Sequence, residues 1–320
     1  MNRKVQTYHL HTIPIHFQIE DALTARRLAS QWTQFRARTA TDAPPIHISL
    51  TTTDTAPPPP DTPAVSVGPD VSYYRQGDDL TVLFPGWGRF DVQLNGNDIR
   101  GRLGRAAVTT YGVLEDMILC ALAPLLRRRG FYAIHAFAAA VEGRALLILG
   151  DTGAGKTTTG VSLLLQGAQL VANDTPLLHP EIDGRPQLYA YPGLLSAYPD
   201  SIIRFPALTH LLEDGQRLAH SEKISFAAET IRPDIWTDQA RPAALVFPVI
   251  QPGLPHSRLE PMRSFDALQQ LISQSIEDWD AATIPAQLRT LRSLVEVAPA
   301  WRLHLAPDIP RLPDLLLPLL

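Results

Sequence analysis

The stretch from Ala145 to Gln166 constrains the fold most, because three local patterns follow one another there without a gap. Residues 145–149 form a continuous apolar run, which is typical of a short buried strand, and residues 157–166 have the pattern of a following helix. Between them, the sequence Gly150-Asp-Thr-Gly-Ala-Gly-Lys-Thr157 fills every fixed position of the pattern G-x-x-x-x-G-K-[ST]. A glycine-rich backbone can curl and point successive N–H groups at one centre, beside the positive end of the new helix. The stretch therefore predicts an anion-binding loop for phosphate groups.

We expect the phosphates of a nucleoside triphosphate to bind in this loop. Lys156 can reach the β- and γ-phosphates there, and the hydroxyl of Thr157 can ligate Mg²⁺. A plain glycine-rich turn is the alternative, and the agreement of strand, loop and helix argues against it. The predicted nucleotide contacts are consecutive: Gly150, Asp151, Thr152, Gly153, Ala154, Gly155, Lys156, Thr157 and Thr158.

A carboxylate follows the next predicted strand. The apolar run 168–172 leads directly into Asn173 and Asp174, only 18 residues after Lys156. Because functional groups gather beyond the carboxyl ends of the strands in a doubly wound sheet, we expect Asp174 to lie beside the loop. The alternative is a turn aspartate that only caps the chain before Pro176.

A histidine precedes a third predicted strand, which lies upstream of the loop. Residues 137–141 are predicted to form a strand that turns at Glu142-Gly143 into the strand of the loop, and His135 stands just before it. A single histidine beside apolar residues is more often a hydrogen-bonded core group than a catalytic one. Taken alone, His135 leaves both interpretations open.

Taken together, the segments 135–141, 150–157 and 167–174 resemble the catalytic core of the HPr kinase/phosphorylase family. The resemblance covers about residues 132–178. It is greatest to the divergent HPr-kinase-like serine kinases, which include kinases of ribosomally made peptide precursors such as lasso-peptide precursors. It implies an α/β fold with a P-loop kinase core of the HPr-kinase type.

The resemblance also implies roles for individual residues. Asp174 would be the general base that takes the proton from a substrate hydroxyl, and His135 would lie near the transferred phosphoryl group or position the base. Lys156 would hold the phosphates, while Thr157 and Asp174 would hold Mg²⁺. Phosphoryl transfer consists mostly of positioning and electrostatic stabilisation, and a lysine, a metal and one oriented carboxylate can supply both.

Two departures from the family pattern limit what the resemblance implies. Where the family core carries two adjacent acidic residues, this chain has Asn173 before Asp174, and an amide cannot neutralise the charge of a metal. The segment Tyr191-Pro-Gly-Leu-Leu-Ser-Ala-Tyr-Pro-Asp200 stands in place of the glycine-rich segment of the true HPr enzymes. We therefore expect the kinase activity, but neither phosphate removal nor HPr docking.

The chain has 320 residues, of which 45% are hydrophobic, and this is enough for two domains with cores of their own. Residues 1–130 are predicted to form an N-terminal α+β domain with an antiparallel sheet, suited to substrate recognition or to homo-oligomer formation. Residues 131–320 are predicted to form the catalytic domain. The other elements expected are strands at 6–19 with a break at Pro14, 46–52, 79–84, 90–94, 99–103, 243–250 and 301–305, and helices at 22–38, 109–129, 265–276 and 285–297.

Composition excludes several classes of partner. The net charge is −4 without a lysine- or arginine-rich stripe, which argues against nucleic acid. No stretch approaches the roughly 20 apolar residues of a membrane span, and no signal-peptide pattern is present, so we expect a cytoplasmic protein without a membrane partner. The single cysteine, Cys120, excludes an internal disulfide. Lys223 and Arg204 could each clamp a phosphate, but exposed surface cations are the better interpretation.

Three functions remain. The leading one is an ATP- and Mg²⁺-dependent kinase for a serine or threonine hydroxyl of a peptide or small protein. The second is a small-molecule kinase that acts on free serine or a sugar. The third is a nucleotide-binding regulator without catalysis, which Asn173 motivates.

Overall fold

The computed structural model describes residues 4–36, 42–217 and 222–320 of the chain. Its contacts divide the chain into two compact units, the first extending to Leu126 and the second beginning at Arg127. The expected domain boundary near Gly130 lies just inside the second unit.

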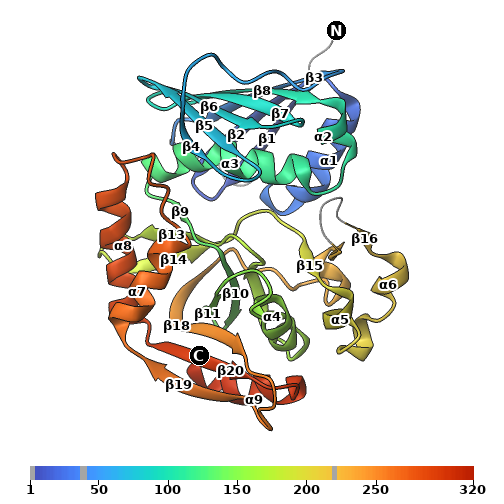
Figure 1. The fold of residues 1–320 in the computed structure, drawn as a ribbon, viewed down its shortest axis with the longest axis vertical. Coiled ribbons are helices and arrows are strands. Elements are labelled where there is room, and N and C mark those ends of the chain that lie inside the picture. The colour runs from blue at the N-terminus through green and yellow to red at the C-terminus, as the bar shows by residue number, and fades with distance from the viewer. Residues whose placement is uncertain (1–3, 37–41, 218–221) are drawn as a thin grey trace. The chain divides into compact units, whose positions relative to one another are not determined.

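The first unit is built on a mixed β-sheet, coloured blue to cyan in Figure 1. β2 runs parallel to β3 and β3 runs parallel to β8, whereas the other neighbours are antiparallel. The prediction of an antiparallel sheet is therefore wrong for these two pairs. β2 and β3 can be parallel because helix α1 (Ala22–Gln31) lies between them in the chain and forms a crossover connection. The strands β4 to β7 lie between β3 and β8 in the chain. The strand order is β1 (Lys4–Leu10), β2 (Ile13–Ile19), β3 (Ile46–Thr53), β8 (Asp98–Gly104), β7 (Gly88–Gln93), β6 (Asp79–Phe84), β5 (Ser72–Gln76) and β4 (Ala64–Val67).

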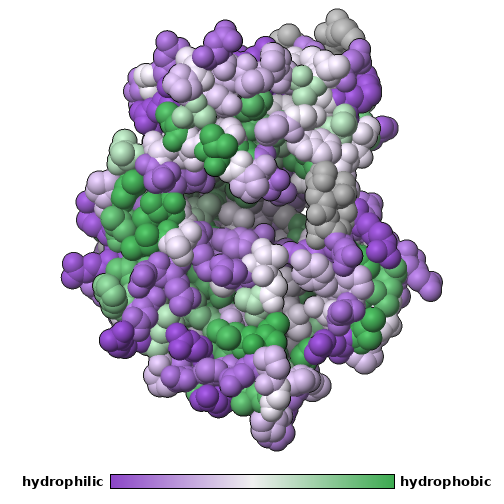
Figure 2. All heavy atoms as spheres, viewed as in Figure 1, coloured by the Kyte–Doolittle hydropathy of each residue, from purple (hydrophilic) through white to green (hydrophobic). Residues whose placement is uncertain are grey.

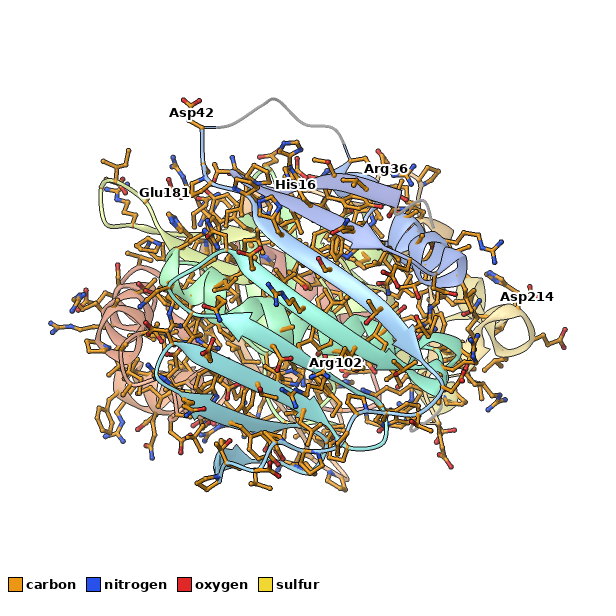
Figure 3. All side chains as sticks on the ribbon, turned by 90° about the horizontal axis from the view of Figure 1, so that it is seen from above. His16, Arg36, Asp42, Arg102, Glu181 and Asp214 are labelled. Carbon is orange, nitrogen blue, oxygen red and sulfur yellow. The ribbon has the colours of Figure 1, made fainter. Side chains whose placement is uncertain are left out.

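Alternation along the strands gives this sheet a buried face and a polar face. On β2, Ile15 and Phe17 are buried, whereas His16 between them is partly exposed. Figure 3 looks onto the sheet, with His16 labelled on β2 and Arg102 on β8. The buried face packs against aromatic residues near α1, since the rings of Phe17 and Trp32 lie 5.4 Å apart.

Three expectations for the first unit need correction. The helix predicted at 109–129 begins later, as α3 (Val113–Arg128), because Gly112 adopts a φ of 88° just before it, and a separate short helix, α2 (Arg105–Thr109), precedes it. The predicted helix 22–38 is shorter: α1 is followed by a 3₁₀ turn at Thr33–Phe35, and residues 37–38 lie outside the described ones. The break expected at Pro14 falls at residues 11–12, and Pro14 lies within β2.

The second unit is built on another mixed sheet, shown green to red in Figure 1. Its main path is β12 (Gln169–Ala172), β10 (Ala136–Val141), β11 (Arg144–Leu149), β18 (Gln239–Ile250), β14 (Pro186–Tyr189), β13 (Leu177–Pro180) and β9 (Tyr132–Ala133), and β20 (Ala300–Leu305) pairs with both β18 and β19 (Arg258–Met262). A small separate sheet contains β15 (Leu195–Ala197), β17 (Ile224–Phe226) and β16 (Gln216–Arg217). The helices of this unit are α4 (Lys156–Leu165), α5 (Pro199–Ile202), α6 (Leu211–Asp214), α7 (Ser264–Ser273), α8 (Ile284–Val297) and α9 (Leu312–Leu316), with 3₁₀ turns at Pro206–Leu208, Ala228–Thr230, Ile309–Arg311 and Leu317–Leu319.

Helices cover the main sheet of the second unit on both faces. Phe137 and Ala139 of β10 belong to the apolar core on the α4 side, whereas Ala138 and Ala140 belong to the core on the side of α7 and α8. α4 approaches β10 closely, because a Cβ on its Gly160 would lie 2.3 Å from the ring of Phe137. Figure 2 shows mainly hydrophilic residues on the surface of this unit, between scattered hydrophobic patches. Among the residues described, no helix combines the length and the apolar character needed to cross a membrane.

The strand directions bring three chain segments to one edge of this sheet. β10 runs antiparallel to both β11 and β12. The carboxyl ends of β11 and β12 therefore lie at the same edge as the amino end of β10. The loop that follows β11, the residues that follow β12 and the residue that precedes β10 meet there.

Candidate functional site

The glycine-rich loop connects β11 directly to α4, in the order that the sequence predicts. Gly153 has a φ of 84°, and Gly155, the N-cap residue of α4, has a φ of 102°, both in the left-handed region that favours glycine. A Cβ on Gly155 would also lie 2.6 Å from Cδ1 of Leu305. The backbone conformation at Gly155 therefore requires glycine, and a larger residue would also displace the end of the Leu305 side chain.

Lys156 turns back over this loop. The residue is buried, with 8% of its surface exposed, and its ammonium donates hydrogen bonds to the carbonyl oxygens of Gly150 (2.6 Å) and Asp151 (3.2 Å). Its third neighbour is Nε2 of His135, at 2.9 Å. An ammonium group has three hydrogens and no lone pair, so each hydrogen faces one of these three acceptors.

The Lys156 contact fixes the proton on the His135 ring. Because the ammonium can only donate, Nε2 must accept, and the proton of the neutral ring lies on Nδ1. Nδ1 faces Oδ1 of Asp174 at 3.5 Å. The backbone strengthens this arrangement, since the N–H of Ala136 donates to the carbonyl of Asp174 at 3.1 Å. Lys156, His135 and Asp174 form a continuous row.

Burial is the main influence on the two basic groups of this row. It lowers the pKa of His135, the charge of Asp174 opposes this effect, and the charges of Lys156 and Lys223 add to it. Burial likewise lowers the pKa of Lys156, again against Asp174 and with Lys223. Side-chain exposure is 39% for His135 and 60% for Asp174, so the carboxylate end of the row is open to an approaching molecule.

Asn173 has a structural contact that sequence reasoning did not supply. Its Nδ2 donates to the carbonyl oxygen of Leu194 at 2.9 Å. On the other side of this segment, the hydroxyl of Thr158 lies 3.1 Å from that of Ser201. The segment 191–200 is thus held by the side chain of Asn173, which binds Leu194 within it, and by the side chain of Thr158, which contacts Ser201 directly after it.

The structure places the remaining predicted site residues along the same loop and helix. Asp151, Thr152 and Gly153 are exposed, while Thr157 and Thr158 are partly buried in the first turn of α4. The charge of Asp151 partly opposes the lowering of the pKa of Lys156. Within the described ranges, no cluster of three or more His, Cys, Asp or Glu side chains suits a metal.

The two surface cations considered from the sequence behave differently. Arg204 donates from Nε to the carbonyl of Asp200 and lines a surface hollow together with residues from the second half of α4 and with Gln166, which follows it. Lys223 is partly buried, and its charge acts on both Lys156 and His135. Its partial burial and its contact with the ring of Tyr198 differ from the fully exposed surface cation that the sequence suggests.

Comparisons with known proteins add little to this geometry. No protein-family model matches the chain, and no curated protein matches it. Among solved structures, the Hpr(Ser) kinase/phosphatase from Coxiella burnetii matches with 13% sequence identity and a TM-score of 0.31, over 58% of this chain and 93% of that chain. A likeness at this TM-score carries no argument about the fold or the activity of this chain.

Proposed function

We propose that this chain is an ATP- and Mg²⁺-dependent kinase for a serine or threonine hydroxyl of a peptide or small protein. The observation that carries the proposal is the row Lys156–His135–Asp174 beside the glycine-rich loop. It places a cation and an open carboxylate next to backbone groups that can bind an anion. Phosphoryl transfer needs these parts.

The residues of the site fit a nucleoside triphosphate with its metal. Gly155, which lies next to Leu305, has no side chain that would cover the backbone of the loop. The N-terminal end of α4, which favours an anion, follows directly. Mg²⁺ takes one or two protein carboxylates together with phosphate oxygens and water. Asp174 and the hydroxyl of Thr157 are the protein ligands we propose, because the amide of Asn173 is engaged with Leu194.

The residues of the site then have the following roles in the reaction. ATP would supply its γ-phosphoryl group, with ADP leaving as the bond from the γ-phosphorus to the bridging oxygen breaks, and Mg²⁺ would neutralise part of the phosphate charge. Lys156 exchanges its carbonyl partners for phosphate oxygens. Asp174 accepts the proton of the substrate hydroxyl as its oxygen bonds to phosphorus, and His135 holds Asp174 from the side of Nδ1.

The exposure of Asp174 supports a large acceptor. A small-molecule kinase typically encloses its substrate in a pocket. Here the base is 60% exposed, which leaves room for a serine or threonine carried on a peptide.

The test of this proposal is Asp174→Asn, which keeps the size of the side chain but removes the proton acceptor. We expect Mg-ATP affinity to stay within about tenfold, while phosphoryl transfer falls by about 10²–10⁴-fold. The assay is label transfer from ATP to serine- and threonine-containing peptides, with free serine and sugars in parallel. Asp183→Asn is the matched control, since Asp183 is 61% exposed in the same unit and should leave transfer unchanged.

The outcomes separate the three functions. Transfer to free serine or a sugar but not to peptides would favour the small-molecule kinase. Binding of ATP by the wild type without transfer to any acceptor would favour the regulator. Unchanged transfer by Asp174→Asn would remove Asp174 from the chemistry.

A further inference from the structure

Lys223 reaches the site through the small sheet of the second unit. β15 and β17 are antiparallel, with Ser196 opposite Ser225 and the two hydroxyl oxygens 2.6 Å apart. Side chains two positions apart share a face of a strand, so Tyr198 and Lys223 are the next pair along this face. Their contact agrees with this register, since Nζ of Lys223 lies 5.4 Å from the centroid of the Tyr198 ring. The partly exposed ring therefore holds the ammonium by a cation–π interaction.

The segment that carries Tyr198, between β15 and α5, is fixed to both sides of the predicted phosphate site. Leu194, just before β15, accepts the hydrogen bond from Asn173, the neighbour of Asp174. Ser201, in α5, meets Thr158 in the first turn of α4. Tyr198 lies between these two attachments in the chain, so the segment that holds Lys223 is tied to the site at both ends.

The electrostatic effect of Lys223 agrees with this placement. Its charge lowers the pKa of both Lys156 and His135. Two ammonium groups that repel each other across a site are both stabilised when an anion lies between them. A phosphate group is such an anion.

The composition of the chain supports a specific role for this side chain. Of its 28 lysines and arginines, only three are lysines: Lys4, Lys156 and Lys223. Lysine is therefore the exception in this sequence, and two of the three lie at the same site. An ammonium is a compact point charge on a flexible stem, suited to a phosphate group.

We propose that Lys223 is a second phosphate-binding lysine, which contacts the terminal phosphate of the nucleotide together with Lys156. The proposal rests on the proposed function, because it assumes that a nucleoside triphosphate occupies the loop. It assigns discrimination between ATP and ADP to Lys223, since ADP lacks the phosphate that it contacts. Tyr198 positions the ammonium and does not touch the nucleotide.

The small number of lysines allows a direct test by amine labelling. The wild-type protein is acylated with a limiting amount of an amine-reactive reagent, and the labelling rates of Lys4, Lys156 and Lys223 are measured by mass spectrometry. We expect Mg²⁺ with a non-hydrolysable ATP analogue to slow labelling of Lys156 and Lys223 by about tenfold or more, and Mg-ADP to protect Lys156 alone. Lys4, the first residue of β1 in the other unit, serves as the internal control.

The labelling outcomes distinguish the proposed role of Lys223 from the proposed kinase function on which it rests. Protection of Lys156 without protection of Lys223 would overturn the role of Lys223 and leave the kinase standing. Equal protection of Lys223 by ADP would overturn the contact with the terminal phosphate. Protection of neither lysine at saturating nucleotide would remove the nucleotide site itself.

A second measurement tests whether protection reflects direct contact. Lys223→Met should weaken Mg-ATP binding by about 10–100-fold with little change for Mg-ADP, while Lys223→Arg, which keeps the charge, should retain most of the preference for ATP. Arg204→Met removes a positive charge elsewhere in the same unit and should leave both affinities unchanged. Unaltered ATP and ADP affinities in a folded Lys223→Met protein would overturn the proposal.

Discussion

At the scale of single residues, the site is a row of polar contacts with a defined direction. Lys156 donates to His135, and the ring of His135 then presents its remaining proton to Asp174. A second proton, added at Nε2, would place a positively charged ring against the ammonium of Lys156 at hydrogen-bond distance. The neutral form of His135 is therefore part of the folded structure, in agreement with the pKa of this residue, which burial lowers most and the charge of Lys156 lowers further.

The first prediction is a pH dependence of stability that belongs to His135. Because the pKa of this ring is lower in the folded chain than its ordinary value of about 6.5, the unfolded chain takes up the proton first as the pH falls. Stability from His135 is present above about pH 6.5 and is lost below it. We expect the free energy of unfolding of the wild type, relative to His135→Asn, to decrease from pH 7 to pH 5.

Chemical denaturation at several pH values checks this difference, with nucleotide and metal left out. Subtracting the variant removes the contributions of other titrating groups, which both proteins share. A difference that stays constant, or that grows as the pH falls, would contradict the neutral ring and the hydrogen bond from Lys156.

The second prediction concerns Asn173, whose amide donates to Leu194. Asn173→Asp replaces this donor by a carboxylate that faces a carbonyl oxygen, so we expect a loss of about 1–3 kcal/mol in the free energy of unfolding. Asn95→Asp, at an exposed turn of the first unit, is the matched control and should change stability little. Equal stabilities of Asn173→Asp and wild type in denaturant titrations would show that the contact does not hold the 191–200 segment.

At the scale of elements, the position of the loop depends on how closely α4 packs on β10. Gly160 lies against Phe137, and both residues are fully enclosed by the core of the second unit. The same helix begins at Gly155 and Lys156, and the same strand follows His135. The distance between the two elements therefore sets the distance between Lys156 and His135.

The third prediction follows from this packing. Gly160→Ala would place a methyl group 2.3 Å from the Phe137 ring, so the helix or the ring must move, and we expect a loss of about 1–3 kcal/mol in the free energy of unfolding. Gly193→Ala is the control, because a Cβ there has no neighbour among the described atoms within 4 Å. Combining Gly160→Ala with Phe137→Leu should recover part of the loss. A loss that is the same with and without Phe137→Leu would show that the ring is not the obstacle.

At the scale of the whole molecule, the sequence predicted the strand–loop–helix segment and the partners that the topology brings to it. The pattern around Lys156 is local, and Asp174 and His135 each stand one strand away from it. The contact of Lys223 with Tyr198 could not be predicted from the sequence, because it depends on the pairing of two strands of three residues each, too short for a clear alternation. Asp280 gave no signal at all. It is fully buried against Arg127 and Arg128, more than 150 residues away in the chain.

The most direct test of the account is the binding of Mg-ATP to the wild type and to Lys156→Ala, measured by titration calorimetry. Through the hydrogen bonds of its ammonium group, Lys156 connects the carbonyl groups of the loop to His135, which faces Asp174. We predict saturable binding at one site in the wild type, and affinity at least about tenfold weaker in a folded Lys156→Ala protein. Absence of binding to the wild type, or equal affinity in the two proteins, would contradict the assignment of this loop as a nucleotide site.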